Sequence, residues 1–183
     1  ELFLYKDYEK TNSSTISDQV DAITRPTKPY LDMTFGMGKQ NYPALAMTQY
    51  SAIQFCKWLY ARTGVFYRLP TEAEWQFVCQ AGTKTIRYDE INKIAWYKKN
   101  SQNSSQKVGQ KEPNAFGIYD MLGNVWEWCN DIYDETVYGS YRTFRGGGWY
   151  DEERSIMATT RRRSHPISFK IDDLGFRVAK NKW

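Results

Sequence analysis

Two acidic side chains stand close together in the segment PNAFGIYDMLGNVWEWCND, which covers residues 113–131. Asp120 and Glu127 flank Gly123, and a glycine lets the backbone turn tightly enough to aim carbonyl oxygens at an ion. Hard cations such as Ca²⁺ prefer several oxygen ligands, so this pattern predicts an oxygen-lined cation site. The alternative is that both acids cap a turn and pair with arginines, and spacing alone favours neither.

Thiol and imidazole groups are few. Cys56, Cys79 and Cys129 form no CxxC pair, and His165 is the single histidine of the chain. These residues are too few and too widely spaced for a Cys/His zinc site. We therefore expect three buried, reduced cysteines that act as small hydrophobes.

Other catalytic arrangements find little support. No GxSxG motif accompanies His165, and no GxxxxGK[ST] phosphate loop occurs. The paired acids at 89–90, 151–153 and 172–173 are better explained as solvated loops than as a general acid and base.

Composition indicates one folded domain. The 183 residues are 41% hydrophobic and 16% aromatic, enough for a sizeable core in which rings supply much of the buried area. The net charge is only +4, and no long basic run alternates with aromatics, so no nucleic-acid partner is expected. No segment resembles a signal peptide or a transmembrane span. The chain begins at Glu1, which leaves room for a removed targeting segment.

Two short helices are expected to precede a series of strands. Thr48 is the expected N-cap of the first helix, and Gly64 can close it in a left-handed conformation. The sequence TEAE, starting at Thr71, predicts a capping box for the second helix, with Phe77 on its apolar stripe and Gly82 at its end.

The rest of the chain predicts loops and short strands. Residues 1–30 form a polar, irregular lead-in, and residues 31–183 form a single domain. A short strand is expected around 44–47 and a solvated loop over 98–112, followed by aromatic strands separated by glycine turns. Two helices followed by many short strands favour an α+β fold.

Five motifs together resemble a known family. They are RLPTEAEW at 68–75, the segment at 113–131, RGGGW at 145–149, RRRSHP at 161–166 and GFRV at 175–178. Their order and spacing are similar to those of the formylglycine-generating enzymes, the sulfatase-modifying factor family. The resemblance implies a variant of the C-type lectin fold, with short antiparallel strands and long ordered loops. The family domain usually begins with strands that this chain lacks or reduces, so we expect a fragment, which an intact mass would test.

The resemblance also gives the acidic pair a role. Asp120, Gly123, Val125 and Glu127 match the family's calcium site, which implies a structural Ca²⁺ ion that ties loops together.

The family's oxidative chemistry has lost its ligands here. Members that oxidise a substrate cysteine use two cysteines after the RGGGW-like motif, because soft thiolates hold Cu(I). Asp151 occupies about the first of these positions and Ile156 or Met157 the second, while Gly148 stands where the family usually has serine. Iron-dependent members of the family take their histidines mainly from an additional domain. The sequence therefore predicts neither a copper nor an iron site.

The residues of the family's substrate groove remain as a candidate binding surface. They are Trp126, Trp149, Tyr150, Asp151, Arg154, Arg161, Arg163 and His165. Aromatic residues and arginine are typical of binding hot spots. The alternative is that both tryptophans are core and that the arginines pair with acids, with Arg177 buried against Glu72 or Glu74.

Our first hypothesis is a non-catalytic, calcium-stabilised family member that binds a peptide, a protein or a glycan as a module or scaffold. The alternatives are a divergent oxidoreductase acting on a protein substrate and a structural component of an exported cell-envelope assembly. An exported or envelope location is favoured over the cytoplasm. The sequence gives neither the ligand nor the oligomeric state.

Overall fold

The computed structural model describes residues 33–180. The expected lead-in over residues 1–30 therefore lies outside the described residues. Within 33–180, no helix is both long and apolar enough to cross a membrane.

The first expected helix is confirmed as α3 (Gln49–Thr63). The hydroxyl of Thr48 accepts a hydrogen bond from the Ser51 N–H at 3.1 Å, and Gly64 ends the helix with φ 68°. Both ends are fixed by local hydrogen bonding, which explains why the sequence alone placed them.

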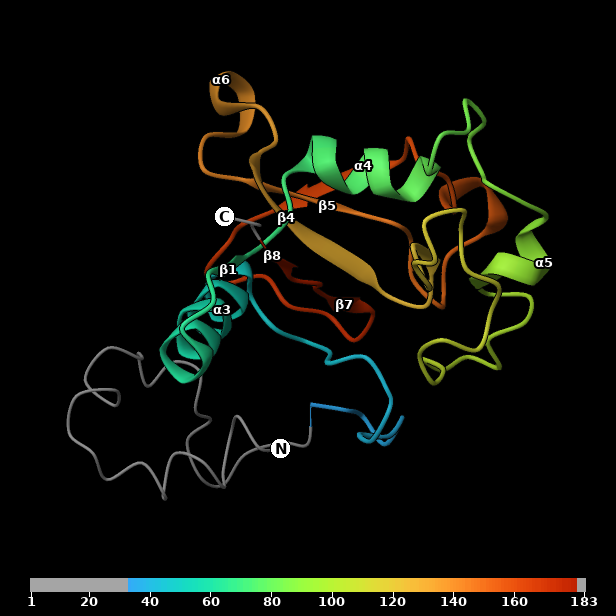
Figure 1. Ribbon diagram of the computed structural model, residues 1–183, viewed down its shortest axis with the longest axis horizontal. Helices are drawn as coiled ribbons and strands as arrows, with labels where there is room; N and C mark the ends of the chain where they lie inside the picture. Colours follow the sequence, from blue (N-terminus) through green and yellow to red (C-terminus); the bar gives the residue numbers. More distant parts are fainter. Residues whose placement is uncertain (1–32, 181–183) are drawn as a thin grey trace.

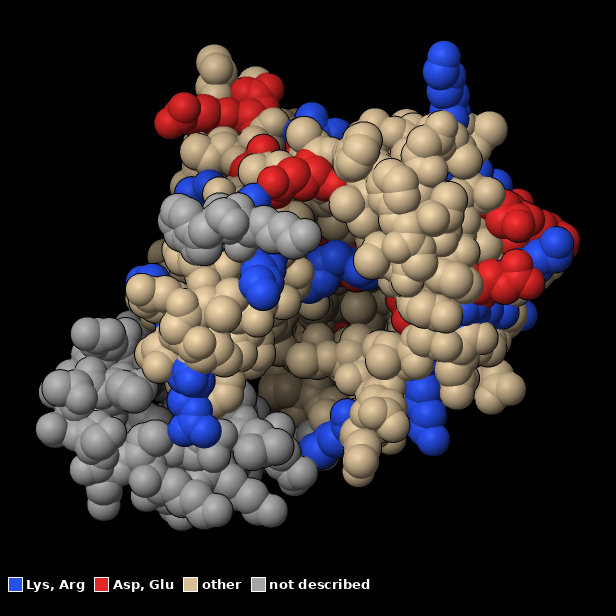
Figure 2. Space-filling model, in the orientation of Figure 1, with Lys and Arg blue, Asp and Glu red and all other residues tan. Residues whose placement is uncertain are grey.

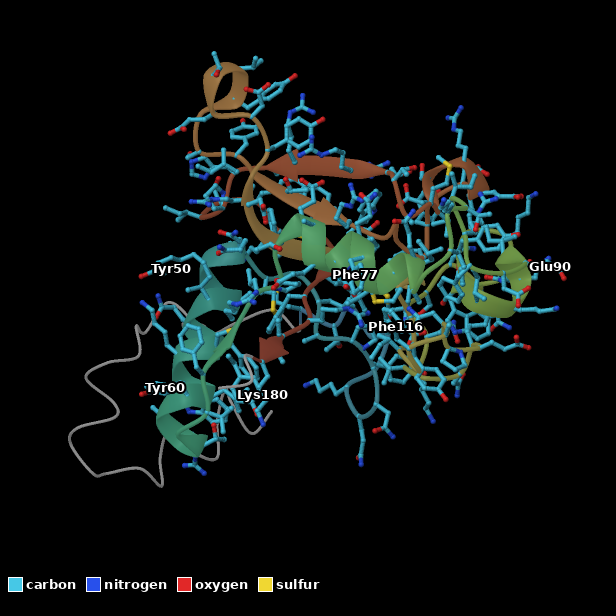
Figure 3. The ribbon with its side chains drawn as sticks, turned by 45° about the horizontal axis from the view of Figure 1, so that its top comes forward. Tyr50, Tyr60, Phe77, Glu90, Phe116 and Lys180 are labelled. Carbon is cyan, nitrogen blue, oxygen red and sulfur yellow. The ribbon has the colours of Figure 1, made fainter. Side chains whose placement is uncertain are left out.

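The second helix, α4 (Glu72–Gln80), has the expected capping box. The Thr71 hydroxyl accepts from the Glu74 N–H, while the Glu74 carboxylate accepts from the Thr71 N–H. The helix ends at Ala81, which adopts a left-handed φ of 46°, one residue before Gly82. The apolar stripe was assigned wrongly, because Phe77 is 65% exposed whereas Trp75 and Cys79 are buried. Phe77 instead lies beside the exposed ring of Phe116, with ring centroids 5.6 Å apart (Figure 3).

Short strands and turns of helix make up the remainder, as an α+β fold requires. The helical turns are α5 (Ile91–Ile94), α6 (Glu135–Tyr138) and η3 (Glu153–Ser155). The strands are β1 (Tyr67–Arg68), β2 (Ala95–Trp96), β3 (Leu122–Gly123), β4 (Trp126–Ile132), β5 (Arg142–Arg145), β6 (Arg161–Ser164), β7 (Leu174–Gly175) and β8 (Ala179–Lys180). No strand forms at 44–47, where Leu45 and Ala46 pack irregularly against Val125.

One four-stranded sheet organises the domain, in the order β6-β5-β4-β7. Its β4–β5 and β5–β6 pairs are antiparallel, whereas β4 and β7 run parallel. Two smaller pairs, antiparallel β1–β8 and parallel β2–β3, lie outside it. Figure 1 shows α4 lying across β4 and β5, with α3 and β1 at the lower left and α6 at the upper left of the view.

The strand β4 is buried on both faces, which explains its continuous run of buried residues. Trp126 and Trp128 pack in one cluster with Cys56 of α3, whereas Cys129 packs in another with Trp75 of α4. Because side chains alternate along a strand, neighbouring residues of β4 serve opposite faces of the sheet.

Side chains hold much of the irregular chain in place. Asn124 is 2% exposed; its side-chain oxygen accepts from the Gln106 N–H at 2.9 Å, and its amide nitrogen donates to the Gln106 carbonyl at 3.0 Å. The hydroxyl of Ser101 donates to the Trp149 carbonyl at 2.8 Å. These bonds replace strand pairing in loops that pass through the interior. The face seen in Figure 2 is hollowed near its centre, with basic side chains beside the hollow.

Candidate functional sites on two faces of the sheet

The carboxylate of Glu127 lies on the α4 face of β4 and is 5% exposed. One oxygen accepts from Trp75 Nε1 at 2.7 Å and from Arg177 Nε at 2.5 Å, and the other accepts from Arg177 Nη2 at 2.6 Å. A bidentate arginine pair of this kind neutralises the carboxylate where it is buried. The expectation that Arg177 pairs with Glu72 or Glu74 was therefore wrong.

The two acids expected to hold Arg177 have other partners. Glu72 binds Arg145, which is 2% exposed, and also forms a bidentate pair with Arg161. Glu74 pairs with Arg68 on β1, and the pKa of Glu74 falls to about 2 because of that hydrogen-bonded pair.

The other residues of the predicted calcium site lie around a strained turn. Asp120 adopts a φ of 54°, and its side chain accepts from the Gly109 N–H at 2.6 Å. Burial raises the pKa of Asp120, so its ionised form is unfavourable here unless a positive charge lies nearby. A Cβ on Gly123 would lie 2.3 Å from the Trp96 carbonyl oxygen, and Val125 is 7% exposed. The residues fit Ca²⁺ only in part, because both oxygens of the Glu127 carboxylate already accept hydrogen bonds from Arg177.

A second polar site lies on the opposite face of β4, around Asp151. Its Oδ2 accepts from Trp126 Nε1 at 2.6 Å and from the Gly148 N–H at 2.8 Å. Its Oδ1 accepts from Arg162 Nη2 at 3.0 Å, and the Arg162 guanidinium lies 4.6 Å from the centre of the Trp126 ring. Asp151, which stands at about the first of the family's two cysteine positions, thus has an ordered carboxylate.

Asp173 adds a second carboxylate to this site. The residue is 9% exposed, and its Oδ1 has no hydrogen-bond partner within residues 33–180. A Cβ on Gly148 would lie 2.4 Å from Asp173 Oδ2, so the missing side chain makes room for this acid. Burial, followed by the charges of Asp151 and Asp172, raises the pKa of Asp173 to about 6, although Arg162 acts in the opposite direction.

The predicted groove residues do not gather on one face. On β6, Arg161 pairs with Arg145 and Arg163 with Thr143, so Arg161 and Arg163 lie on the α4 face of the sheet. Arg162 lies on the other face, against Trp126. Arg163 stacks on Tyr138 of α6 and on Tyr133 before it, and His165 binds Ser168 through Nδ1.

The remaining predicted groove residues lie near Asp151. Trp149 is 8% exposed and donates from Nε1 to the Asp172 carbonyl at 3.3 Å. Tyr150 is 58% exposed, with Lys98 Nζ 5.4 Å from its ring centre. Arg154 lies on η3 and is exposed. Trp126, Trp149, Tyr150 and Asp151 therefore form one neighbourhood.

The cysteines are buried and free. Burial raises the pKa of Cys56 to about 11 and that of Cys79 to about 12, and it also raises the pKa of Cys129. The thiolate is the nucleophile and the metal ligand, so these thiols are unreactive at neutral pH. They lie in the core, as expected.

Sequence reasoning missed three participants. Asp173 was assigned to a solvated loop, although its contact with Gly148 depends on the missing side chain there. Arg162 was missed because the run of arginines does not show which of them share a face until β6 is paired with β5. Tyr138 was missed because its contact with Arg163 depends on the same pairing.

A short mixed domain of this kind, with few helices, short strands and long ordered loops, is a formylglycine-generating-enzyme type of fold. The model of the sulfatase-modifying factor enzyme 1-like domain matches residues 6–182. The chain belongs to that family.

Relatives with different names share the domain. The chain is 32% identical to serine/threonine-protein kinase pkn1 of Chlamydia pneumoniae, over 79% of this chain and 25% of that protein. It is 30% identical to inactive Cα-formylglycine-generating enzyme 2 of Bos taurus, over 77% of this chain and 51% of that protein. The structure of PvdO from Pseudomonas aeruginosa superimposes with a TM-score of 0.71 at 28% identity, covering 78% of this chain and 63% of PvdO. The chain thus spans between a quarter and about half of these curated relatives.

Proposed function

We propose that this domain is a non-oxidising member of the family that acts as a binding or scaffold module for a peptide, a protein or a glycan. The observation that carries the proposal is that Asp151 and Ile156, which stand at the family's two catalytic cysteine positions, both have structural roles. Asp151 is bound by Trp126, Gly148 and Arg162, and Ile156 is fully buried in the core. Neither side chain is a soft ligand for Cu(I). A relative named as an inactive enzyme supports the proposal.

The neighbourhood of Trp126, Trp149, Tyr150 and Asp151 supports the binding part of the proposal. It combines exposed and buried aromatic rings with an ordered carboxylate and a nearby arginine. Rings of this kind contribute large contact areas at binding surfaces.

The oxidative alternative can be tested directly. The protein is incubated with a cysteine-bearing sulfatase peptide, copper and a reductant, and the peptide is then analysed by mass spectrometry. We expect no conversion of the thiol to an aldehyde, under conditions in which an active formylglycine-generating enzyme converts the same peptide. Conversion by this chain would refute the proposal.

The structural Ca²⁺ ion is a separate proposal. The partly exposed carboxylate of Asp120 next to the Gly123 turn supports it, whereas the Glu127–Arg177 pair competes with it. If the ion binds, Ca²⁺ should raise the melting temperature by mass action, and a chelator should reverse the change. Mg²⁺ at the same ionic strength is the control, and identical melting curves with Ca²⁺, Mg²⁺ and chelator would exclude a stabilising calcium site.

A further inference from the structure

Arg163 differs from the two arginines before it on β6. Arg161 pairs with Glu72, and Arg162 pairs with Asp151. Arg163 makes no hydrogen bond or ion pair within residues 33–180, and its Nε atom is buried. Arg163 is partly exposed, but a buried N–H donor without an acceptor is unfavourable, so its unpaired guanidinium needs an explanation.

Two other arginines also have a buried Nε without a partner, but their remaining nitrogens are bonded. Arg142 donates from Nη1 to the Asn130 carbonyl at 2.8 Å. Arg145 binds Glu72 and Gln76. Within the described residues, Arg163 thus differs from both in having no partner at any nitrogen.

Aromatic rings hold the Arg163 guanidinium in place. Its central carbon lies 3.6 Å from the ring centre of Tyr138 and 4.8 Å from that of Tyr133. Tyr141 stacks on Tyr138, with ring centroids 6.2 Å apart and planes inclined by 23°. Cation–π contacts of this kind use the faces of the guanidinium, so its N–H edges are left for acceptor atoms.

The arginine lines an open surface pocket, which we call the Arg163 pocket. The pocket has a volume of about 530 Å³ and is lined by Val137, Tyr138, Tyr141 and Arg163. Because the pocket is open to solvent, it suits one group at the end of a ligand and does not enclose a whole small molecule. The hydroxyls of Tyr138 and Tyr141 make no hydrogen bond within residues 33–180, so they offer further polar contacts beside flat apolar walls.

The charge around the pocket favours a singly charged anion. Asp134 is the N-cap of α6 and Glu135 is its first residue; both are exposed and adjoin the lining residues in the chain. Figure 2 shows acidic side chains at the end of the molecule where α6 lies. Repulsion from these acids penalises a phosphate dianion more than a carboxylate, and the planar guanidinium matches a carboxylate with two parallel hydrogen bonds.

We propose that the Arg163 pocket binds a carboxylate group of a ligand, with Arg163 as the fork and Tyr138 and Tyr141 as walls. The proposal deepens the binding function proposed above by naming the chemistry of one contact. The Arg163 pocket lies on the opposite face of β6 from Arg162. If the pocket binds no carboxylate, the binding function proposed for the Asp151 neighbourhood is unaffected.

The test uses the Arg Nε–Hε resonance of Arg163 in the whole chain, assigned by its loss in Arg163→Lys. Butyrate and glucuronate, both singly charged, are titrated as probes for an acidic side chain and a sugar acid, against neutral butyramide and inorganic phosphate at constant ionic strength. We expect saturable shifts with a carboxylate, with a dissociation constant on the order of millimolar for one arginine contact. Which carboxylate binds more tightly distinguishes the two sources.

Variants separate recognition from a general ionic effect. Arg163→Lys keeps the charge but loses the fork, and should weaken binding by at least about fivefold, followed through the Tyr138 and Tyr141 ring resonances. Tyr138→Leu should weaken it as well. The matched control is Arg62→Lys, since Arg62 of α3 also lies over a ring, that of Trp58, at 5.8 Å, and should bind as the parent does. The proposal is overturned if no carboxylate gives a saturable shift, if butyramide acts equally, or if phosphate binds more tightly.

Discussion

Replacing Asp173 by asparagine should stabilise the protein at neutral pH. The ordinary pKa of an aspartate is 3.8, and in the folded chain that of Asp173 is about 6, because it is buried beside Asp151 and Asp172. Arg162 compensates only in part. The native state therefore binds the proton more tightly than the unfolded state, and stability falls as pH rises from about 4 to about 6.

The magnitude follows from the same difference in pKa. The ionised carboxylate disfavours the fold by about 3 kcal/mol at pH 7 and by about half of that at pH 5, and the penalty disappears below pH 4. Asp173→Asn keeps the shape and removes the charge, so the variant should gain up to about that amount at pH 7. The amide also places a donor near the carboxylate of Asp151.

Urea unfolding at pH 4, 5, 6 and 7 measures this directly for the wild type and the variant. The gain should grow with pH and level off above pH 6. Asp172→Asn is the matched control, because it changes the net charge equally at a partly exposed neighbour and should have a smaller effect. The reasoning fails if Asp173→Asn has the stability of the wild type at pH 7, or if its gain is the same at every pH.

Three further variants, two single and one double, test other parts of the structure. Glu72→Ala leaves Arg145 buried without its carboxylate and should lower the free energy of unfolding by about 3 kcal/mol in urea titrations, whereas a loss below 1 kcal/mol would mean that the neutral partners suffice. Gly123→Ala combines a positive φ with a clash against a backbone oxygen and should cost at least about 2 kcal/mol in the same assay; an unchanged midpoint would contradict that geometry. The double variant Asp151→Cys with Ile156→Cys should bind one Cu(I) in competition with a chromogenic chelator, since these side chains contact the consecutive residues Gly148 and Gly147. Either single variant should bind it far more weakly, and equal binding by the singles would argue against a two-cysteine site.

Local signals predicted local structure well. Thr48 and Gly64 bound α3 as expected, and the capping box at Thr71 starts α4, because caps depend on residues within one turn. The family and the α+β fold also followed from motifs whose spacing is visible in the chain. Phe77 shows the limit, since its apolar character matched a stripe but the packing of α4 turned Trp75 inward instead.

The partners of charged side chains depended on distant pairing, which the sequence does not display. Arg177 reaches Glu127 only because its segment follows β7 in the sheet, next to β4. The consecutive arginines of β6 were interpreted as one binding surface, yet strand alternation places Arg162 against Asp151 and Arg163 against Tyr133 and Tyr138. A register is set by the whole sheet, so these assignments needed the structure.

The paired hydrogen bonds between Asn124 and Gln106 carry a consequence for the dynamics of the long loop that they hold. In most domains, slow exchange of backbone amide protons marks helices and strands, and loops exchange first. Here the Gln106 amide donates to a side chain that is 2% exposed, and Ser101 is anchored to the carbonyl of Trp149. The loop can open only if these buried contacts break. Its amides should therefore exchange together with those of the sheet, as one cooperative unit that secondary structure alone would not reveal.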